Sequence, residues 1–326
     1  MRRLIPDSFI LALLTTVALA IVLPAQGSVA GAVDILATAA IVLLFFLHGV
    51  RIPREAVLAS LRHWRLHSAI LGSTFVAFPL LGLGMQASAG SLLPQPFLLG
   101  VLFLCALPST VQSSIAFTSI ARGNVAGAVA AATISNLLGM LLTPLLVSLL
   151  LHSQGAGFSA SGVGKIFSQL LLPFVVGQLV RPWLGAWAAR RKKLLTLTDR
   201  GTIVLAVYSA FSAAVTEGVM RNVPVSVLGI LFLFCCVLLC AILFITSAGS
   251  RLLGFDREDE IAIVFCGSKK TLASGIPMAR VLFSGPDLGA IVLPLMMFHQ
   301  LQLMACAWLA RRYAASPLSP AFAANP

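Results

Sequence analysis

The sequence predicts an all-α membrane protein of about ten transmembrane helices, and three observations support this fold class. Only 10% of the 326 residues are charged and 59% are hydrophobic, whereas soluble domains carry about 25% charged residues. Long apolar runs recur along the chain, and each approaches the roughly 20 residues that cross a bilayer. Lysines and arginines gather at the ends of these runs. Together these features leave room for short loops but for no globular aqueous domain.

The apolar runs divide the chain into about ten expected membrane helices. Their approximate bounds are 8–24, 33–50, 67–87, 96–120, 125–151, 166–188, 201–218, 225–248, 260–284 and 288–310. The first run follows Arg2 and Arg3, so it also has the pattern of a signal peptide. We interpret it as an uncleaved helix, because its removal would leave an odd number of spans. The tail, 315–326, is rich in Ala, Pro and Ser and is expected to be disordered.

Basic residues mark alternate connections between the expected helices. They are Arg51, Arg54, Arg62 and Arg65, then Arg122, then Arg190, Arg191, Lys192, Lys193 and Arg200, then Arg251 and Arg257, and finally Arg311 and Arg312. Arg221 is the clear exception to the alternation. The positive-inside rule then puts both termini of a multi-pass plasma-membrane protein in the cytoplasm. The net charge of +12 is thus interpreted as a topology and lipid-headgroup signal, not as a sign of nucleic-acid binding.

The two halves of the chain resemble each other in hydropathy. Residues 1–160 and 161–314 each carry about five of the expected helices. Because five is odd, the second copy enters the membrane from the opposite side, which is the inverted-repeat plan of many secondary transporters. The halves share little sequence identity, so a chance likeness of hydropathy is the alternative.

A helix breaker and a polar cluster interrupt the fourth helix of each half. The run Leu107–Ser114 contains Pro108, and the run Phe265–Thr271 contains Gly267. An interrupted helix exposes backbone groups, which the membrane tolerates only where they find partners or line a cavity. Paired interruptions therefore predict a transporter's binding site, and we expect them to cross within about one helix diameter, roughly 10 Å. A simple kink, with hydroxyls bonded to their own helix, is the alternative.

Two adjacent lysines, Lys269 and Lys270, lie near the expected middle of the membrane. A lysine at this depth costs about 3 kcal/mol on insertion scales, so two of them need a physical reason. The functional interpretation is anion binding, or a fixed cation in place of a bound metal ion. The structural interpretation is pairing with the carbonyl groups of a broken helix.

Polar side chains near the interruptions complete the candidate site. For solute binding the predicted residues are Lys270, His299, Gln300, Ser109, Thr110 and Gln112. For ion coupling they are Ser113, Ser114, Thr133, Ser135, Asn136, Ser268, Lys269 and Thr271. No residue spacing indicates a metal centre, and no resident cofactor is expected. The sequence has neither a phosphate loop nor an HExxH-like motif, which argues against an ATP-driven pump and against a metalloprotease, and no other enzyme signature is present.

The interrupted helices also carry a family resemblance. The runs Pro108–Ser114, Ala121–Ala126 and Gly267–Leu272, with His299 and Gln300, resemble the bile acid:sodium symporter family and most closely its bacterial SBF-like branch. The resemblance implies a bacterial inner-membrane protein with a panel of helices one, two, six and seven beside a core of the others. It also implies organic-anion solutes, such as bile acids and other carboxylated or sulfated compounds, usually moved with sodium.

The family's sodium ligands match this sequence poorly. In helix four the matching positions are Ser113 and Ser114 or, with a one-residue gap, Ser114 and Ile115. In helix five they are Ala128 and Ala132, with Thr133 the nearest hydroxyl, and in helix three the position is Thr74. The family's carboxylate falls at Phe265, beside Lys269 and Lys270, whereas its helix-ten histidine matches His299. The resemblance therefore implies the fold but not the sodium coupling. A proton exchanged at Lys269 or Lys270 and relayed by His299 is the alternative coupling mechanism.

We therefore predict a secondary transporter, a symporter that moves a small organic anion across the lipid bilayer by rocking the core against the panel. A membrane regulator or sensor with the same fold, and a passive facilitator, are the alternatives. The sequence names neither the solute nor the coupling ion, and it leaves the direction of transport and the oligomeric state open.

Overall fold

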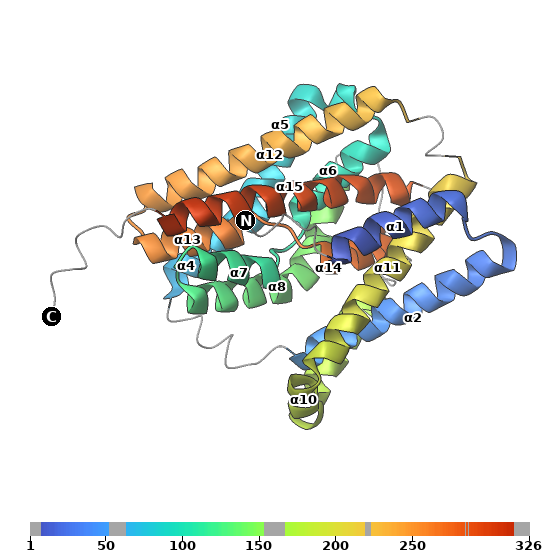
Figure 1. The fold of residues 1–326 in the computed structure, drawn as a ribbon, viewed down its shortest axis with the longest axis horizontal. Helices are drawn as coiled ribbons and strands as arrows, with labels where there is room; N and C mark the ends of the chain where they lie inside the picture. Colours follow the sequence, from blue (N-terminus) through green and yellow to red (C-terminus); the bar gives the residue numbers. More distant parts are fainter. Residues whose placement is uncertain are drawn as a thin grey trace.

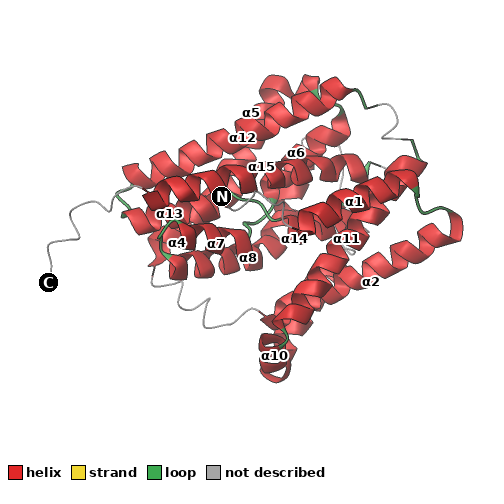
Figure 2. Ribbon diagram, viewed as in Figure 1, coloured by secondary structure: helices red, strands yellow, loops and turns green. Residues whose placement is uncertain are grey.

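The computed structural model describes residues 8–51, 63–152, 167–218, 223–283, 285 and 287–315. Within these ranges the regular structure is helical throughout and contains no strand (Figure 2). Seven helices of the described chain are long and apolar enough to cross a membrane. The expectation of an all-α, multi-span protein is therefore confirmed.

The helices follow one another with few intervening residues. They are α1 (Ser8–Val22), α2 (Gly27–Arg51), α4 (Trp64–Gly72), η2 (Ser73–Ala77), α5 (Phe78–Ala89), η3 (Gly90–Leu92), α6 (Gln95–Ala106), α7 (Gln112–Ile120), α8 (Val125–His152), η4 (Phe167–Leu171), α10 (Leu172–Arg190), α11 (Lys192–Thr216), α12 (Val225–Leu252), α13 (Arg257–Gly267), α14 (Leu272–Leu282) and α15 (Leu288–Ala315). The elements η2 and η4 are π-helical turns, and η3 is a 3₁₀ turn. Helices α4 and α5 with their turns form one continuous candidate span, Trp64–Leu92.

The described helices pack into two groups. Helices α1, α2, α10 and α11 contact one another and form what we call the four-helix group, on the right and lower right of Figure 1. The remaining helices, α4 to α8 and α12 to α15, form the broken-helix group. Helix α11 joins the two groups, because it packs against α14 and α15 as well as against α1 and α2.

Two glycines allow α2 and α10 to approach each other closely inside the four-helix group. A Cβ atom added at Gly49 would lie 2.2 Å from the carbonyl oxygen of Phe174, and one added at Gly177 would lie 2.1 Å from that of Phe46. Both distances are far below van der Waals contact, so only glycine fits at either position. The amide of Gln178 adds a hydrogen bond of 2.8 Å to the carbonyl of Gly49. These contacts hold α2 and α10 together as a unit.

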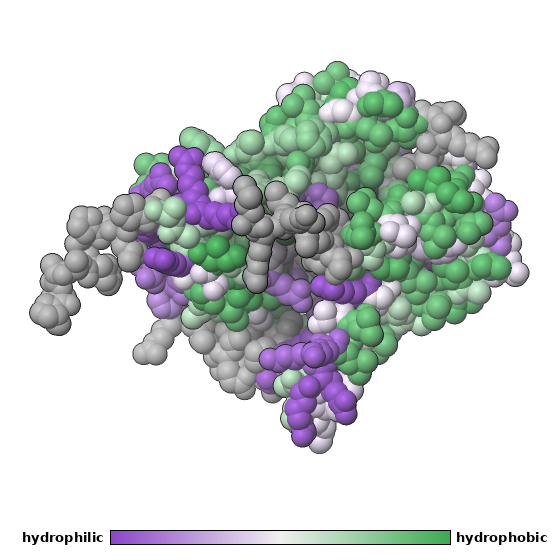
Figure 3. All heavy atoms as spheres, in the orientation of Figure 1, coloured by the Kyte–Doolittle hydropathy of each residue, from purple (hydrophilic) through white to green (hydrophobic). Residues whose placement is uncertain are grey.

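The surface has the distribution of polarity that a bilayer requires. Hydrophobic residues cover much of the face shown in Figure 3, and hydrophilic residues gather at the tip where α10 meets α11. That turn contains Arg190, Arg191, Lys192 and Lys193. Large apolar side chains on the outside of the helices are widely exposed, with Val225 at 84% and Trp183 at 76%. In a bilayer such side chains contact lipid.

Helix bounds differ from expectation mainly at charged residues. Helix α11 begins at Lys192 rather than at 201, because the lysines and Arg200 extend the helix instead of forming a loop. Helix α2 likewise begins at Gly27 rather than at 33. A tight turn joins α7 to α8: Arg122 has a φ of 61°, and the side chain of Asn124 accepts a hydrogen bond from the N–H of Gly127 at 2.7 Å. The predicted tail, 315–326, lies outside the described residues except for Ala315. The predicted boundary between the two repeats, near residue 160, also lies outside them.

Substitution of Gly177 by alanine should destabilise the protein by about 1–3 kcal/mol, since the added methyl group forces α2 and α10 apart. The measurement is the unfolding temperature of the purified protein in detergent. The matched control is Gly31→Ala on α2, where an added Cβ meets no atom within 4 Å. This control should be neutral or slightly stabilising, because alanine favours a helix. Equal stability of the two variants would show that the close contact is unimportant.

Candidate functional site

Both predicted interruptions are present in the structure. Helix α6 ends at Ala106, and Leu107 is extended at φ −73° and ψ 154°, as the residue before a proline prefers. Helix α7 resumes at Gln112. In the second half α13 ends at Gly267 and α14 begins at Leu272. We call residues 107–111 the first break and residues 268–271 the second break.

The two breaks exchange hydrogen bonds with each other. The hydroxyl of Ser109 donates to the carbonyl oxygen of Cys266 at 2.5 Å, and that of Ser114 donates to Phe265 at 2.8 Å. In return the backbone N–H of Thr271 donates to the carbonyl oxygen of Pro108 at 3.0 Å. Direct contact of this kind confirms the prediction that the breaks approach within a helix diameter. It also satisfies backbone groups that a regular helix would have paired internally.

Helix α8 supplies further partners for the first break. The hydroxyl of Ser135 accepts a hydrogen bond from the N–H of Ser109 at 3.0 Å, and the amide of Asn136 donates to the Ser109 carbonyl at 2.7 Å. The hydroxyl of Thr143 donates to the carbonyl of Ala106 at 2.9 Å. Polar residues that looked like candidates for ion coupling therefore hold backbone groups in place. Ser135 lies fully buried in this role.

Lys270 binds the end of the broken helix. Its side chain is fully buried, and its ammonium donates to the carbonyl oxygens of Thr74, Cys105 and Leu107 at 2.8, 2.8 and 2.6 Å. Those three bonds use every proton of the ammonium group. Two of the acceptors lie at the C-terminal end of α6, where the helix dipole favours a cation. The expectation that Lys270 binds solute is untested, but in this conformation the geometry favours the structural alternative, carbonyl pairing.

Lys269 has different surroundings. It is also fully buried, yet its nitrogen has no hydrogen-bond acceptor among the described residues. The ammonium instead lies 4.0 Å from the ring centre of Phe117 and 5.6 Å from that of Phe265. Aromatic faces attract a cation, although less strongly than three carbonyl groups do. The two neighbouring lysines thus have separate roles, and Lys269 is the less firmly held.

Gln302 connects the second break to His299. Its side-chain oxygen accepts from the backbone N–H of Lys270 at 2.9 Å, and its nitrogen donates to the Lys270 carbonyl at 2.9 Å. The same nitrogen lies 2.8 Å from Nδ1 of His299. Gln302 is fully buried, so these bonds are shielded from water. Gln302 was not among the predicted site residues, because its contact with the break joins positions 32 residues apart.

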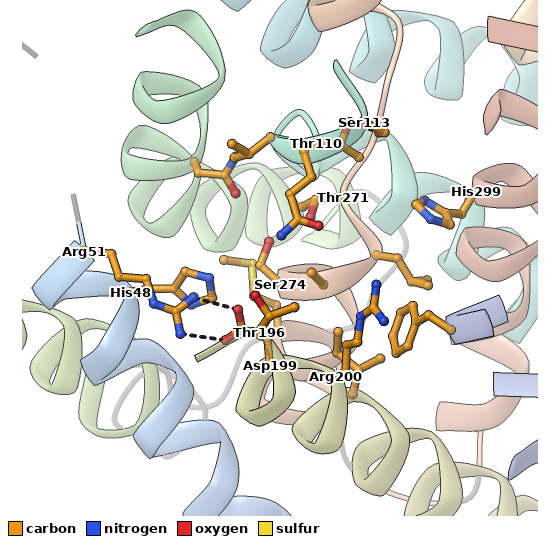
Figure 4. A pocket seen from close by; sticks show the side chains of 18 of the residues that line it. His48, Arg51, Thr110, Ser113, Thr196, Asp199, Arg200, Thr271, Ser274 and His299 are labelled. Atoms are coloured by element: carbon orange, nitrogen blue, oxygen red, sulfur yellow. Dashed lines mark hydrogen bonds and ion pairs between the residues drawn. The ribbon is translucent and has the colours of Figure 1, made fainter. Parts of the chain in front are cut away.

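A cavity of about 370 Å³ lies between the two helix groups and beside the breaks (Figure 4). One wall comes from the four-helix group and the other from both breaks with α7, α8, α14 and α15. Its lining residues are Phe9, His48, Arg51, Thr110, Val111, Gln112, Ser113, Thr133, Asn136, Met140, Thr196, Asp199, Arg200, Ile203, Thr271, Leu272, Ala273, Ser274, Met278, His299 and Leu303. The lining combines apolar side chains with a larger number of polar and charged ones, which can fix the orientation of a small molecule.

Half of the predicted site residues line this cavity. They are Thr110, Gln112, Ser113, Thr133, Asn136, Thr271 and His299. The others, which do not line it, are Ser109, Ser114, Ser135, Ser268, Lys269, Lys270 and Gln300. Most of this second set lies fully buried in or against the breaks. The sequence therefore indicated the region around the breaks. It did not distinguish the residues that line the cavity from the buried residues that hold the breaks in place.

The charged wall of the cavity was not predicted. It contains His48 and Arg51 of α2 and Thr196, Asp199 and Arg200 of α11. Arg51 forms a bidentate pair with Asp199, at 2.6 and 3.1 Å (Figure 4). In the sequence Arg51 and Arg200 were interpreted as topology and headgroup signals, not as site residues. The missed signal is Asp199, a lone carboxylate within a basic run.

A separate polar contact joins the four-helix group to α14 of the broken-helix group. Arg280 of α14 donates to the hydroxyl of Ser209 on α11 at 2.6 Å and pairs with Asp34 of α2. Asp34 precedes the cavity residue His48 on α2 by about four helical turns, roughly 20 Å. We call this contact the Arg280 latch. The latch thus lies nearer the N-terminal end of α2 and the C-terminal end of α11 than the cavity residues of these two helices do.

The role of Lys270 leads to a stability prediction. Replacement of Lys270 by methionine should cost about 3 kcal/mol or more, because three buried carbonyl groups lose their donor. Replacement of Lys269 by methionine, the matched control, removes no hydrogen bond and should cost clearly less. Thermal unfolding of both variants in detergent measures the difference. Equal losses would mean that the carbonyl pairing does not stabilise the breaks.

Comparison with known proteins agrees with this architecture. The sequence matches the SBF-like CPA transporter family over residues 7–315. It is 53% identical to "Uncharacterized protein PA2026" of Pseudomonas aeruginosa, over 96% of this chain and 94% of that protein. It is 52% identical to "Putative symporter YfeH" of Escherichia coli, over 94% and 92%, and 29% identical to "Sodium/bile acid cotransporter 7" of Mus musculus, over 81% and 79%. This chain, a multi-pass membrane protein with two broken helices, belongs to the SBF-like CPA transporter family.

Proposed function

We propose that this protein is a secondary transporter that moves a small organic anion by alternating access. The observation that carries the proposal is the cavity between the two helix groups, located where two broken helices cross. Sites of secondary transporters form at such discontinuous helices, because their freed backbone groups and polar side chains converge there. The names of the relatives, a symporter and a bile acid cotransporter, support transport as the activity.

An anionic solute fits the chemistry of the cavity. Its lining contains two guanidinium groups, Arg51 and Arg200, against one carboxylate, Asp199. Hydroxyl and amide groups of the opposite wall are neutral donors for the rest of a solute. Phe9, Ile203 and Met278 give an apolar surface for a hydrocarbon body. A carboxylated or sulfated amphiphile matches this combination.

The finer architecture follows from the same proposal. The four-helix group corresponds to the panel, and the broken-helix group corresponds to the core of a protein with about ten membrane helices in two inverted repeats. Support comes from the matching positions of the two breaks and from the packing of α1, α2, α10 and α11 apart from the rest. Rocking of one group against the other would then open the cavity to each side in turn.

We infer from the positive-inside rule which end of the interface between the two helix groups faces each side of the membrane. Basic residues at the α10–α11 turn and at the end of α2 favour the cytoplasm, in the bacterial inner membrane, for the end that carries the cavity. The Arg280 latch then lies at the outer end, where it closes the path to the outside. We infer that the described conformation faces inward.

The coupling mechanism differs from sodium symport. We infer that the ammonium of Lys270 takes the place of a bound cation, since three carbonyl oxygens already coordinate it. A sodium ion about 5 Å from that ammonium would be repelled by about 3 kcal/mol at an effective dielectric constant of 20. Lys269, with no acceptor among the described residues, is the better candidate for a group that exchanges a proton during the cycle.

Uptake of radiolabelled organic anions into proteoliposomes tests the function, and a panel that begins with the bile salt taurocholate gives a defined starting point. Replacement of sodium by potassium or choline should leave the uptake rate within about twofold, since no sodium ion has to bind beside the ammonium. An imposed pH gradient should change the rate if Lys269 exchanges a proton. Strict sodium dependence that is lost in Ser113→Ala, Ser114→Ala or Thr133→Ala would falsify the proposed coupling.

The same assay separates the alternative functions. A facilitator equilibrates a solute without concentrating it, and a regulator or sensor transports none of the tested anions. A secondary transporter concentrates its solute when the driving gradient is imposed. The result therefore distinguishes a failed coupling mechanism from a failed assignment of transport.

The Arg280 latch gives a prediction about conformation. In intact cells, an impermeant maleimide added outside should label a Ser113→Cys reporter about two- to fivefold more when Asp34 is replaced by Asn. The reason is that the Arg280–Asp34 ion pair, whose carboxylate is largely exposed, contributes up to about 1 kcal/mol to the closed outer end. The reporter background replaces Cys236 and Cys240, which are not fully buried. Glu217→Gln, at the same end of α11 but outside the latch, is the control. Unchanged labelling, or an equal rise in the control, would contradict a gating role.

A further inference from the structure

Gln302 lies in a position where backbone groups fix the orientation of its side chain. The N–H of Lys270 can only donate, and the carbonyl of Lys270 can only accept. Each faces one end of the Gln302 carboxamide, at 2.9 Å in both cases. The oxygen of Gln302 must therefore face the N–H, and the nitrogen must face the carbonyl. The usual ambiguity of a glutamine side chain does not arise here.

This orientation determines the state of His299. The Gln302 nitrogen carries two protons, and one of them is donated to the carbonyl of Lys270. The other points to Nδ1 of His299, 2.8 Å away. Nδ1 can accept that proton only if it carries none itself, since two N–H groups would otherwise face each other. The proton of the neutral imidazole then resides on Nε2.

The assigned tautomer gives the cavity a hydrogen-bond donor. His299 lines the cavity, and its ring points into it from α15 in Figure 4. We propose that Gln302 is a positioning residue that holds His299 as the Nε2–H tautomer, so that the imidazole offers an N–H donor to an oxygen acceptor of the solute. A carboxylate or sulfate oxygen matches such a donor, whereas an ammonium group does not. This match to the solute rests on the proposed function, but the tautomer does not.

The arrangement also links the solute site to the second break. Gln302 forms hydrogen bonds with the backbone of Lys270, and the side chain of Lys270 donates to carbonyl groups at the end of α6. A movement of the break would therefore move Gln302 and change its contact with Nδ1 of His299. The ability of His299 to donate to an oxygen of the solute therefore depends on how the two broken helices are arranged.

Nitrogen-15 NMR of histidine-labelled protein in lipid nanodiscs tests the proposal directly. The two ring nitrogens of His299 give distinct signals, which are identified as those missing from the His299→Asn variant. In the unsubstituted protein we expect a bare, pyridine-like Nδ1 and a protonated, pyrrole-like Nε2. A protonated Nδ1 would overturn the proposal. No solute is needed, so the result is independent of whether the protein transports.

Substitution of Gln302 provides a second, sharper test. In Gln302→Glu the carboxylate oxygens can only accept, so Nδ1 should become protonated and its signal should move from pyridine-like to pyrrole-like. The control is Gln300→Glu, which adds the same charge to the same helix at a position that does not line the cavity; its His299 signals should not change. An unchanged Nδ1 in Gln302→Glu would overturn the positioning role. If that variant fails to fold, the spectrum of the unsubstituted protein still decides the tautomer.

Discussion

The pairing of freed backbone groups at the crossing of two broken helices is the constraint on which the rest of this structure depends. Within a bilayer an unpaired N–H or C=O costs several kcal/mol, so each break needs partners from elsewhere in the bundle. The breaks supply some of them to each other through Ser109, Ser114 and Thr271. Lys270, Ser135 and Thr143 supply others. Without these bonds the polar centre of the protein would have no stable form.

This constraint explains why the polar residues near the breaks divide into two sets. One set is buried and pairs with the backbone, and the other lines the cavity. Side chains that satisfy the backbone, such as Ser114 and Lys270, lie buried and do not line the cavity. Their neighbours in the sequence, such as Ser113 and Thr271, line it, and Asn136 both lines it and pairs with the Ser109 carbonyl. The charged wall comes from α2 and α11 of the other helix group. A molecule bound in this cavity would therefore contact both helix groups.

Much of the fold could be predicted from the sequence, because its signals are strong in a membrane. Apolar length and the breakers Pro108 and Gly267 act locally, and the described structure is helical, with seven helices long and apolar enough to cross a membrane and with both breaks. The split of the candidate site could not be predicted, since it depends on which face of a short helix meets a distant segment. Ser113 and Ser114 are adjacent and alike, yet only Ser113 lines the cavity. The wall at Arg51 and Asp199 was missed because their pairing joins residues 148 positions apart, which no local pattern reveals.

In a transporter of anions, the buried ammonium of Lys270 would also have an electrical consequence. A sodium ion carried with an anion crosses the membrane and neutralises the charge that moves. An ammonium that belongs to the protein and keeps its proton returns with the empty carrier, so over a full cycle it transfers no charge. A monovalent anion carried alone would then feel the whole membrane potential, about 2.3 kcal/mol for each 100 mV. With the cell interior negative, that energy opposes entry by roughly fiftyfold in concentration and drives exit equally strongly. For a carrier of this kind, the exchange of sodium ligands for fixed lysines would turn an accumulating device into an exporting one.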